Sequence, residues 1–321
     1  MTATGPLSDV MILGQGAAAY SAAIYAARYQ IKTTIFGEEF GGETATGGVI
    51  ENYPGAPQID GLDLMLKFKE QVDALEVPVV PENVTELRRG VDGWEVLAGG
   101  EWHRGKTVII AVGRQRRTIG LPNEKAMMGK GVSYCSTCDA PLYRNKQVVV
   151  VGGGDSALKG ALLISKYATN VFLSYRGGQF FRPEPIAIQR VQEAPNIEVL
   201  FNSSVVALKG EPLLNEVVVG FQDGQKRVIE ADGIFVEIGA DPNSGFAKAI
   251  GAEVNDRGEL VVDMHMRTSL PGVFAAGDVC NASGDLKQTI TAAAQGAIAA
   301  TSAYDFVTKM PRSAPATAAK R

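Results

Sequence analysis

Asp9-Val-Met-Ile-Leu13 followed by Gly14-Gln-Gly16-Ala-Ala-Ala19 is the stretch that decides the fold of this chain. The apolar run predicts a buried strand, and the glycines predict a tight turn into a helix whose small residues, Ala19 included, lie close to a sheet. A second strand, Thr33 to Phe36, leads to Glu38 and Glu39. An acid about twenty residues after the first glycine suits a ribose, so the order of elements predicts a dinucleotide site.

The same pattern occurs again in the middle of the chain. Gln147 to Val151 predicts a buried parallel strand, Gly152-Gly-Gly154-Asp-Ser-Ala157 a second glycine turn, and Asn170 to Leu173 the next strand. A length of 321 residues is enough for two domains. We therefore expect an α/β protein with two Rossmann-like units, and either two nucleotide sites or one site plus a retained scaffold. A last helix is expected from about Gln288 to Val307.

Composition and charge argue against several classes of function. The net charge is −4 and no run of Lys and Arg occurs, so nothing indicates a nucleic-acid partner. No apolar stretch approaches the roughly 20 residues needed to span a membrane. The start of the chain does not read as a signal peptide, so we expect a cytoplasmic protein. The tail, residues 311–321, is expected to be disordered.

Cys135-Ser-Thr-Cys138, followed by Asp139, is the strongest chemical signal. The chain has three cysteines, too few for a disulfide scaffold, so the CxxC pair is either redox-active or metal-binding. A structural zinc site normally needs four Cys or His ligands. His103 and His265 are far away in the sequence, which favours redox chemistry.

These motifs together resemble the low-molecular-weight thioredoxin reductases. The resemblance covers nearly the whole chain and rests on the first glycine turn, Glu51 to Gly55, Ala111-Val-Gly113, CSTCD, GGGDSA and Gly272 to Asp278. It implies three-layer ββα domains, the second inserted into the first. The FAD domain would comprise residues 1–116 and 244–321, and a pyridine-nucleotide domain that carries the CxxC would comprise residues 117–243. It also implies a homodimer that joins mainly through the FAD domains.

The resemblance implies a role for each matched residue. Cys138 would exchange electrons with the flavin, Cys135 would attack the disulfide of thioredoxin or a similar small protein, and Asp139 would act as general acid or base. Alternatively, Asp139 has only a structural role in a turn or a helix cap. Cys280 is expected to be a structural thiol rather than a third redox group. The residues implied for FAD are Gly14, Gly16, Ala19, Glu38 or Glu39, Asn52, Ala111, Gly113, Gly277, Asp278, Lys287, Gln288 and Thr289. Lys287 stands where the family usually has Arg, which loses the planar fork of donors.

The second nucleotide site departs from the family pattern. NADPH-using relatives carry His-Arg-Arg-x-x-x-Arg after the second strand of this unit, whereas this chain has Tyr175, Arg176 and Gly177, with a later Arg182. One interpretation is that NADPH still binds through Gly152, Gly154, Ala157, Arg176 and Arg182. The other is that electrons come from another donor, such as ferredoxin, as in some relatives.

Two further alternatives stay open. Tyr175, Phe180 and Phe181 either pack within their loop or form an aromatic plug over the site. The whole protein could also be a redox-responsive flavoprotein that binds a partner without catalysis, although CSTCD favours an enzyme. The sequence does not decide between these donors or identify the protein substrate.

Overall fold

The computed structural model describes residues 6–46, 49–50, 52–181, 183–284 and 286–309. The chain divides into two compact units: unit 1 comprises Met1–Arg114 and Pro242–Arg321, and unit 2 comprises Gln115–Asp241. The boundaries expected from the sequence, after residues 116 and 243, lie two residues further along. Short strands β9 (Arg114–Arg116) and β18 (Ala240–Pro242) pair where the two units join.

Unit 1 is built on a seven-stranded sheet in the order β5-β2-β1-β8-β7-β6, with β19 beside β8. Its centre is parallel and fully apolar: Ile12 of β1 aligns with Ile35 of β2 and with Ile109 of β8, and all three side chains are fully buried. The strands are β1 (Ser8–Leu13), β2 (Thr33–Phe36), β5 (Val79–Val80), β6 (Val84–Arg89), β7 (Trp94–Ala98), β8 (Glu101–Ile110) and β19 (Val273–Ala275), with a separate pair β3 (Val49–Ile50) and β4 (Ile59–Asp60).

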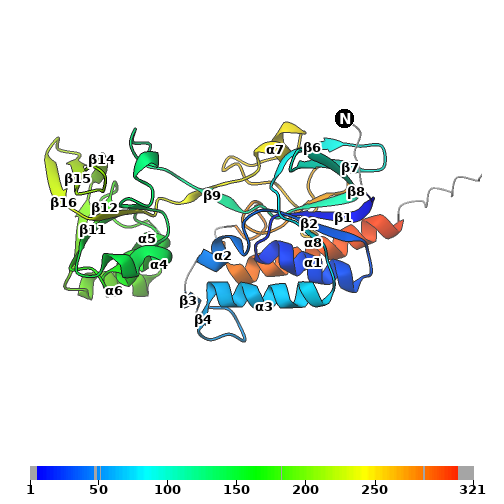
Figure 1. Cartoon of the computed structure of the whole chain (residues 1–321), viewed down its shortest axis with the longest axis horizontal. Helices are drawn as coiled ribbons and strands as arrows, with labels where there is room; N and C mark the ends of the chain where they lie inside the picture. Colours follow the sequence, from blue (N-terminus) through cyan, green and yellow to red (C-terminus); the bar gives the residue numbers. More distant parts are fainter. Residues whose placement is uncertain (1–5, 47–48, 51, 182, 285, 310–321) are drawn as a thin grey trace, which may run out of the picture. The chain divides into compact units, whose positions relative to one another are not determined.

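Helices α1 and α8 lie side by side against this sheet (Figure 1). They can approach closely because α8 carries Gly296, where an added Cβ would stand 2.1 Å from the Ala18 carbonyl oxygen. The alanine-rich faces of both helices bury against each other. The helices of unit 1 are α1 (Ala17–Arg28), α2 (Gly42–Thr46), α3 (Gly61–Ala74), α7 (Gly245–Ala249) and α8 (Thr289–Lys309).

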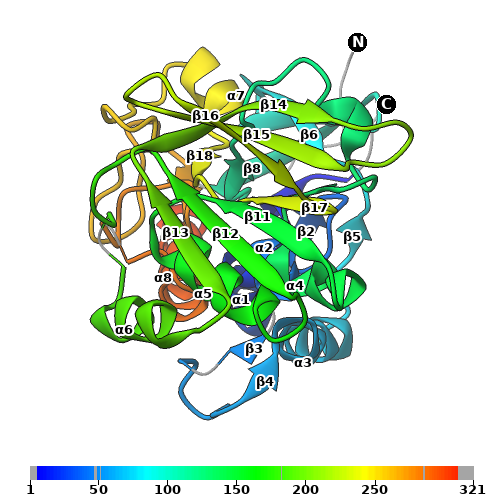
Figure 2. The same cartoon turned by 90° about the vertical axis from the view of Figure 1, so that its left-hand side faces the viewer.

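Unit 2 has three layers. A five-stranded parallel sheet, β10-β17-β11-β12-β13, is covered on one face by helices and on the other by an antiparallel sheet, β14-β15-β16 (Figure 2). Its elements are β10 (Val132–Ser133), α4 (Ser136–Asp139), β11 (Gln147–Val151), α5 (Asp155–Ile164), β12 (Asn170–Tyr175), α6 (Pro185–Glu193), β13 (Ile197–Phe201), β14 (Ser203–Lys209), β15 (Glu216–Phe221), β16 (Lys226–Glu230) and β17 (Gly233–Val236), with 3₁₀ turns at Lys125–Met127 and Ala140–Tyr143.

The predicted α/β class is confirmed in both units, and element ends moved by a few residues. α5 ends at Ile164 rather than near Tyr167. Just beyond this end, Asn196 Nδ2 donates hydrogen bonds to the carbonyl oxygens of Ser165 and Ala168. These carbonyls therefore have a hydrogen-bond donor without a further turn of helix. Among the described residues, no helix is long and apolar enough to cross a membrane.

Candidate functional site

Cys135 and Cys138 form a disulfide, with their Cα atoms 5.3 Å apart. Cys135 is the N-cap of the single-turn helix α4, and Cys138 lies within it; Cys135 is half-buried and Cys138 is exposed. The backbone N–H of Cys138 points at Cys135 Sγ, 3.1 Å away. A hydrogen bond to a sulfur favours its anionic form, so in the reduced pair this contact stabilises a thiolate at Cys135.

The CxxC turn is held within unit 2 by contacts with α5 and with Glu237, the residue that follows β17. Ser136, which is buried between the two cysteines, donates a hydrogen bond of 2.7 Å to Glu237 Oε1. α5 carries Gly160 opposite this serine, and an added Cβ there would stand 2.6 Å from Ser136 Oγ. The missing side chain of Gly160 therefore makes room for the turn.

A buried carboxylate anchors the residue that precedes Cys135. Glu124, 3% exposed, accepts 2.8 Å hydrogen bonds from the N–H groups of Ile119 and Gly120, and it also accepts one from the Tyr134 hydroxyl. Burial, followed by this hydrogen bond and the charge of Glu124, raises the pKa of Tyr134 well above its ordinary value. Tyr134 thus stays a neutral donor that holds the chain leading into the disulfide.

Asp139 follows the disulfide directly and is half-buried. It occupies the cap position of the next 3₁₀ turn, but its side chain makes no cap hydrogen bond. The described part of the chain offers its carboxylate no hydrogen-bond partner. The structure therefore gives no support to the cap interpretation, and it leaves the carboxylate available to a proton.

The first glycine turn in unit 1 has the geometry that a dinucleotide needs. Gly14 has φ +114°, and a Cβ there would stand 2.2 Å from the Ala111 carbonyl oxygen, so only glycine fits. Gly16 caps α1 and has open space where a side chain would be, as does Gly113 at φ +60°. Ala19 is fully buried in α1. An anion can reach the free N–H groups at the start of this twelve-residue helix.

The two acids beyond β2 differ in their contacts. Glu38 is engaged with Asn83, which donates from Nδ2 to the Glu38 carboxylate at 3.0 Å and accepts from the Glu38 N–H at 3.2 Å. Glu39 is exposed, and no described residue bonds to its side chain. This difference favours Glu39 as the acid available to a ribose.

Gly277 and Asp278 follow strand β19, which pairs with β8. Gly277 has φ +80°, and its N–H donates to Gln295 Oε1 at 2.7 Å. Burial, and next the charge of Glu43, raise the pKa of Asp278 to about 6 against the opposing charges of Lys287 and Arg114. Cys280 is fully buried and its Sγ lies 3.3 Å from the Gly277 carbonyl oxygen, which supports a structural thiol.

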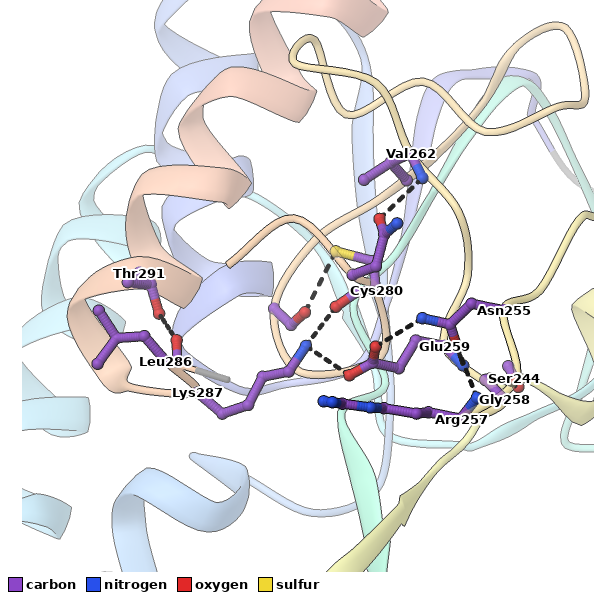
Figure 3. A network of polar contacts seen from close by, with 12 residues as sticks. Ser244, Asn255, Arg257, Gly258, Glu259, Val262, Cys280, Leu286, Lys287 and Thr291 are labelled. Atoms are coloured by element: carbon purple, nitrogen blue, oxygen red, sulfur yellow. Dashed lines mark hydrogen bonds and ion pairs between the residues drawn. The ribbon is translucent and has the colours of Figure 1, made fainter. Parts of the chain in front are cut away.

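Lys287 lies in a buried ion pair that the sequence did not reveal (Figure 3). Its Nζ is 2.9 Å from Glu259 Oε1, and the two side chains are 10% and 3% exposed. The ammonium group also donates to the Cys280 carbonyl, and Asn255 Nδ2 donates to Glu259 at 2.9 Å. Burial alone would raise the pKa of Glu259, but the hydrogen bonds from Asn255 and Lys287 outweigh it and lower the pKa.

Other candidate residues come together from distant parts of unit 1. Asn52 Nδ2 donates to Gln288 Oε1 at 2.9 Å, and Thr289 Oγ1 lies 3.2 Å from Thr44 Oγ1. Arg114 Nε is buried, and no described residue accepts a hydrogen bond from it. A buried donor without a partner in the described structure, together with open glycines and the half-buried Asp278, fits a polar, anionic dinucleotide such as FAD.

The second glycine turn is in unit 2. Gly152, at φ +146°, has the Glu237 carbonyl oxygen 2.2 Å from the position of a Cβ, while Gly154 caps α5 and Ala157 is fully buried. Arg176 is exposed, and its carbonyl accepts from Gln222. The predicted Arg182, residue Glu51 of the resemblance and the tail 311–321 lie outside the described residues.

Sequence reasoning missed the residues that support the site: Glu124, Glu237, Asn255, Glu259 and Gln295. Their partners are remote in sequence, and no local periodicity marks them. The resemblance pointed to Lys287 but not to its partner Glu259, because nothing in a single sequence distinguishes a buried glutamate from an exposed one.

Comparison with known proteins identifies the family of this chain. The family model described as pyridine nucleotide-disulphide oxidoreductase matches residues 8–296. The chain is 37% identical over 303 residues to thioredoxin reductase of Mycolicibacterium smegmatis, covering 93% of this chain and 96% of the relative. It is 36% identical over 302 residues to thioredoxin reductase of Treponema pallidum, covering 93% and 97%.

Solved structures give the same result. Lactococcus lactis thioredoxin reductase, in its FR conformation, superposes with a TM-score of 0.88 at 34% identity and covers 94% of this chain and 100% of that one. Thioredoxin reductase of T. acidophilum gives a TM-score of 0.85 at 34% identity, with 93% and 98% covered. With its fold, its glycine turns and its CxxC disulfide all in place, this chain belongs to the pyridine nucleotide-disulphide oxidoreductase family, among the low-molecular-weight thioredoxin reductases.

Proposed function

We propose that this protein is an FAD enzyme that reduces the disulfide of thioredoxin or a similar small protein. The observation that carries the proposal is the Cys135–Cys138 disulfide, which is exposed at Cys138 and is followed by Asp139, whose carboxylate has no hydrogen-bond partner among the described residues. A structural disulfide would be expected to link segments that are distant in the sequence. This one closes only a four-residue loop, within a turn that the hydrogen bond between Ser136 and Glu237 already holds. The relatives named thioredoxin reductase support the same substrate class.

Unit 1 would hold the FAD. Gly14, Gly16 and the start of α1 would receive the pyrophosphate, and Glu39 would bind the adenosine ribose. Asp278 would contact the polar chain between phosphate and flavin ring, close to Ala111 and Gly113. Near the ring we place Asn52, Lys287, Gln288 and Thr289. FAD, when bound, supplies the pair of electrons that opens the disulfide.

The residues of unit 2 would then carry out two exchanges of thiol and disulfide. The Cys135 thiolate, favoured by the Cys138 N–H, attacks one sulfur of the substrate disulfide, whose S–S bond breaks. Asp139 gives a proton to the departing substrate thiolate. Cys138 then attacks Cys135 Sγ, which releases the second substrate thiol and forms the internal disulfide again. The balance is one substrate disulfide, two electrons and two protons converted into two thiols.

Cys138→Ser tests this assignment. The holoprotein is reduced with photochemically generated methyl viologen radical and is then mixed with oxidised thioredoxin. We expect turnover to be lost and a covalent adduct between Cys135 and thioredoxin to accumulate, because the resolving thiol is missing. The double variant Cys135→Ser, Cys138→Ser should form no adduct. Unchanged turnover in Cys138→Ser would refute the mechanism.

If the protein is instead a flavoprotein binding module, the unmodified chain should also show no turnover: it should bind thioredoxin without reducing it. The same assay on the unmodified protein therefore separates the enzyme from the module. We also expect a homodimer in the cytoplasm, as the resemblance implies. Light scattering of the purified holoprotein measures its mass and checks the dimer.

A further inference from the structure

Tyr175, the last residue of β12, lies on the second glycine turn. A Cβ added to Gly153 would stand 2.4 Å from the Cγ and Cδ2 atoms of the Tyr175 ring and 2.5 Å from its Cδ1 atom. Gly153 is buried although it has no side chain. The ring therefore covers the middle of the turn at the carboxyl end of β12, which is where Rossmann units read the ribose of a dinucleotide.

The ring also determines what can stand two residues later. A Cβ added to Gly177 would lie 2.7 Å from Tyr175 Cε1 and 3.1 Å from Cζ. No side chain fits at position 177 unless the tyrosine moves. An arginine near the ribose is the usual way to accept a 2′-phosphate, so Tyr175 excludes that residue from this position.

The segment that follows is tied over the turn. Phe181 N–H donates to the Gly153 carbonyl at 2.7 Å, and the Phe181 carbonyl oxygen stands 3.7 Å from the Cβ position of Gly154. This carbonyl oxygen faces the glycine that a pyrophosphate would approach, so it opposes the anion. Phe180 instead packs edge-on against Phe201, with ring centroids 4.9 Å apart.

Charged groups at the start of α5 hold the same segment. Asp155 accepts from the Glu184 N–H at 3.2 Å, and Lys159 Nζ lies 2.7 Å from Asp155 Oδ2 and 3.2 Å from Glu184 Oε1. Lys159, the cation nearest to the turn on α5, is thus neutralised by two carboxylates. In unit 1 the equivalent approach at Gly16 is open, with no atom within 4 Å of a Cβ position.

From these contacts we infer that Tyr175 and Gly177 are specificity determinants that deny unit 2 a 2′-phosphorylated dinucleotide, so that NADPH is not the reductant of this enzyme. The inference rests on the proposed function, because it concerns the donor of the same flavin. The pair of electrons then enters from a reductant that is not a pyridine nucleotide. Of the two arginines implied for NADPH, Arg176 is the one within the described residues; it is exposed, and an exposed cation contributes little by itself.

Binding and reduction are measured on the natural holoprotein first. Calorimetry with NADP⁺ and with 2′,5′-ADP should show no binding below millimolar concentration, and anaerobic NADPH should not bleach the flavin within seconds. Methyl viologen radical should bleach it, and the reduced protein should then reduce thioredoxin. Micromolar binding of either nucleotide, or fast bleaching by NADPH, would overturn the inference and leave the disulfide chemistry intact. Bleaching by viologen without thioredoxin reduction would overturn the proposed function alone.

Variants test the role of the ring. Gly177→Arg alone should gain little, since Tyr175 fills the space that the new side chain needs. Tyr175→Ala with Gly177→Arg should bind NADP⁺ at least about tenfold more tightly than the natural chain, the effect of one charge-assisted hydrogen bond. NAD⁺ should gain nothing, because it lacks the phosphate. Equal gains for NADP⁺ in the single and double variants would contradict the role of Tyr175.

Discussion

Lys287→Met removes the cation of the buried pair with Glu259 and leaves a side chain of similar length. In the variant the Glu259 carboxylate, 3% exposed, keeps the hydrogen bond from Asn255 but loses both the charge and the donor of Lys287. Removing one partner of a buried pair costs about 3–5 kcal/mol. Because Asn255 still donates and the charge of Arg114 also acts on Glu259, we expect about 3 kcal/mol near neutral pH.

The pH dependence gives the sign of this effect. The folded-state pKa of Glu259 is lowered, so its stabilisation is present above the unfolded pKa of about 4.3 and is lost as pH falls through the lower folded value. In Lys287→Met burial is no longer outweighed, so the pKa of Glu259 rises. The difference between variant and natural chain should therefore shrink as the pH falls towards 4, where the variant's carboxyl becomes protonated.

Urea unfolding followed by tryptophan fluorescence measures the effect in unit 1, which contains both tryptophans of the chain, Trp94 and Trp102. The measurement is made on apoprotein as well as holoprotein, so that a loss of FAD affinity is not counted as a loss of the ion pair. Lys69→Met is the matched control, because Lys69 pairs with Asp73 on the surface and should cost less than about 1 kcal/mol. A cost below about 1 kcal/mol for Lys287→Met at neutral pH would show the reasoning to be wrong.

Three more predictions concern single positions. Asp278→Asn should raise the stability of the apoprotein by up to about 3 kcal/mol at pH 7.5, because the folded-state pKa of Asp278, about 6, exceeds the unfolded value of 3.8 by about two units. Well below pH 3.8 the substitution should have no effect, because Asp278 is then neutral in both the folded and the unfolded state. Urea midpoints at the two pH values measure this difference. Gly160→Ala should slow thioredoxin reduction at least about tenfold, because its Cβ meets Ser136 Oγ at 2.6 Å, whereas Gly245→Ala, with no atom within 4 Å, should leave the rate unchanged. Glu124→Gln should lower the stability of unit 2 by about 1–3 kcal/mol in thermal unfolding, since one amide oxygen cannot replace a carboxylate that serves several donors; no change in the midpoint would contradict this.

The parts of the fold that follow local rules were predictable from the sequence. The strand over residues 147–151 was predicted at the bounds that the structure has, because an unbroken valine run before three glycines has few other solutions. The last helix begins at Thr289 and ends at Lys309, within two residues of the prediction. The disulfide partners were also evident from their spacing.

Pairings between remote residues could not be predicted in this way. Asn52 meets Gln288 across 236 positions of sequence, and Lys287 meets Glu259 only because the segment after α7 returns beneath the start of α8. A single sequence gives the type of each residue but not its burial. It is burial that makes an unpaired glutamate carboxylate unfavourable unless a cation such as Lys287 lies beside it. Gly160 is a similar case, since its purpose is visible only when Ser136 is placed against it.

The two glycine turns of this chain show what such a motif specifies. Both begin with a glycine whose missing side chain admits a carbonyl from a neighbouring strand at 2.2 Å, Ala111 in unit 1 and Glu237 in unit 2. That contact sets the backbone, and it is the same whether or not a nucleotide can enter. The difference lies after the next strand, where no described residue of unit 1 bonds to the Glu39 side chain, whereas unit 2 places the ring of Tyr175 on the turn. The motif therefore predicts a strand, a turn and a helix, while the residues after the second strand determine which ligand the turn accepts.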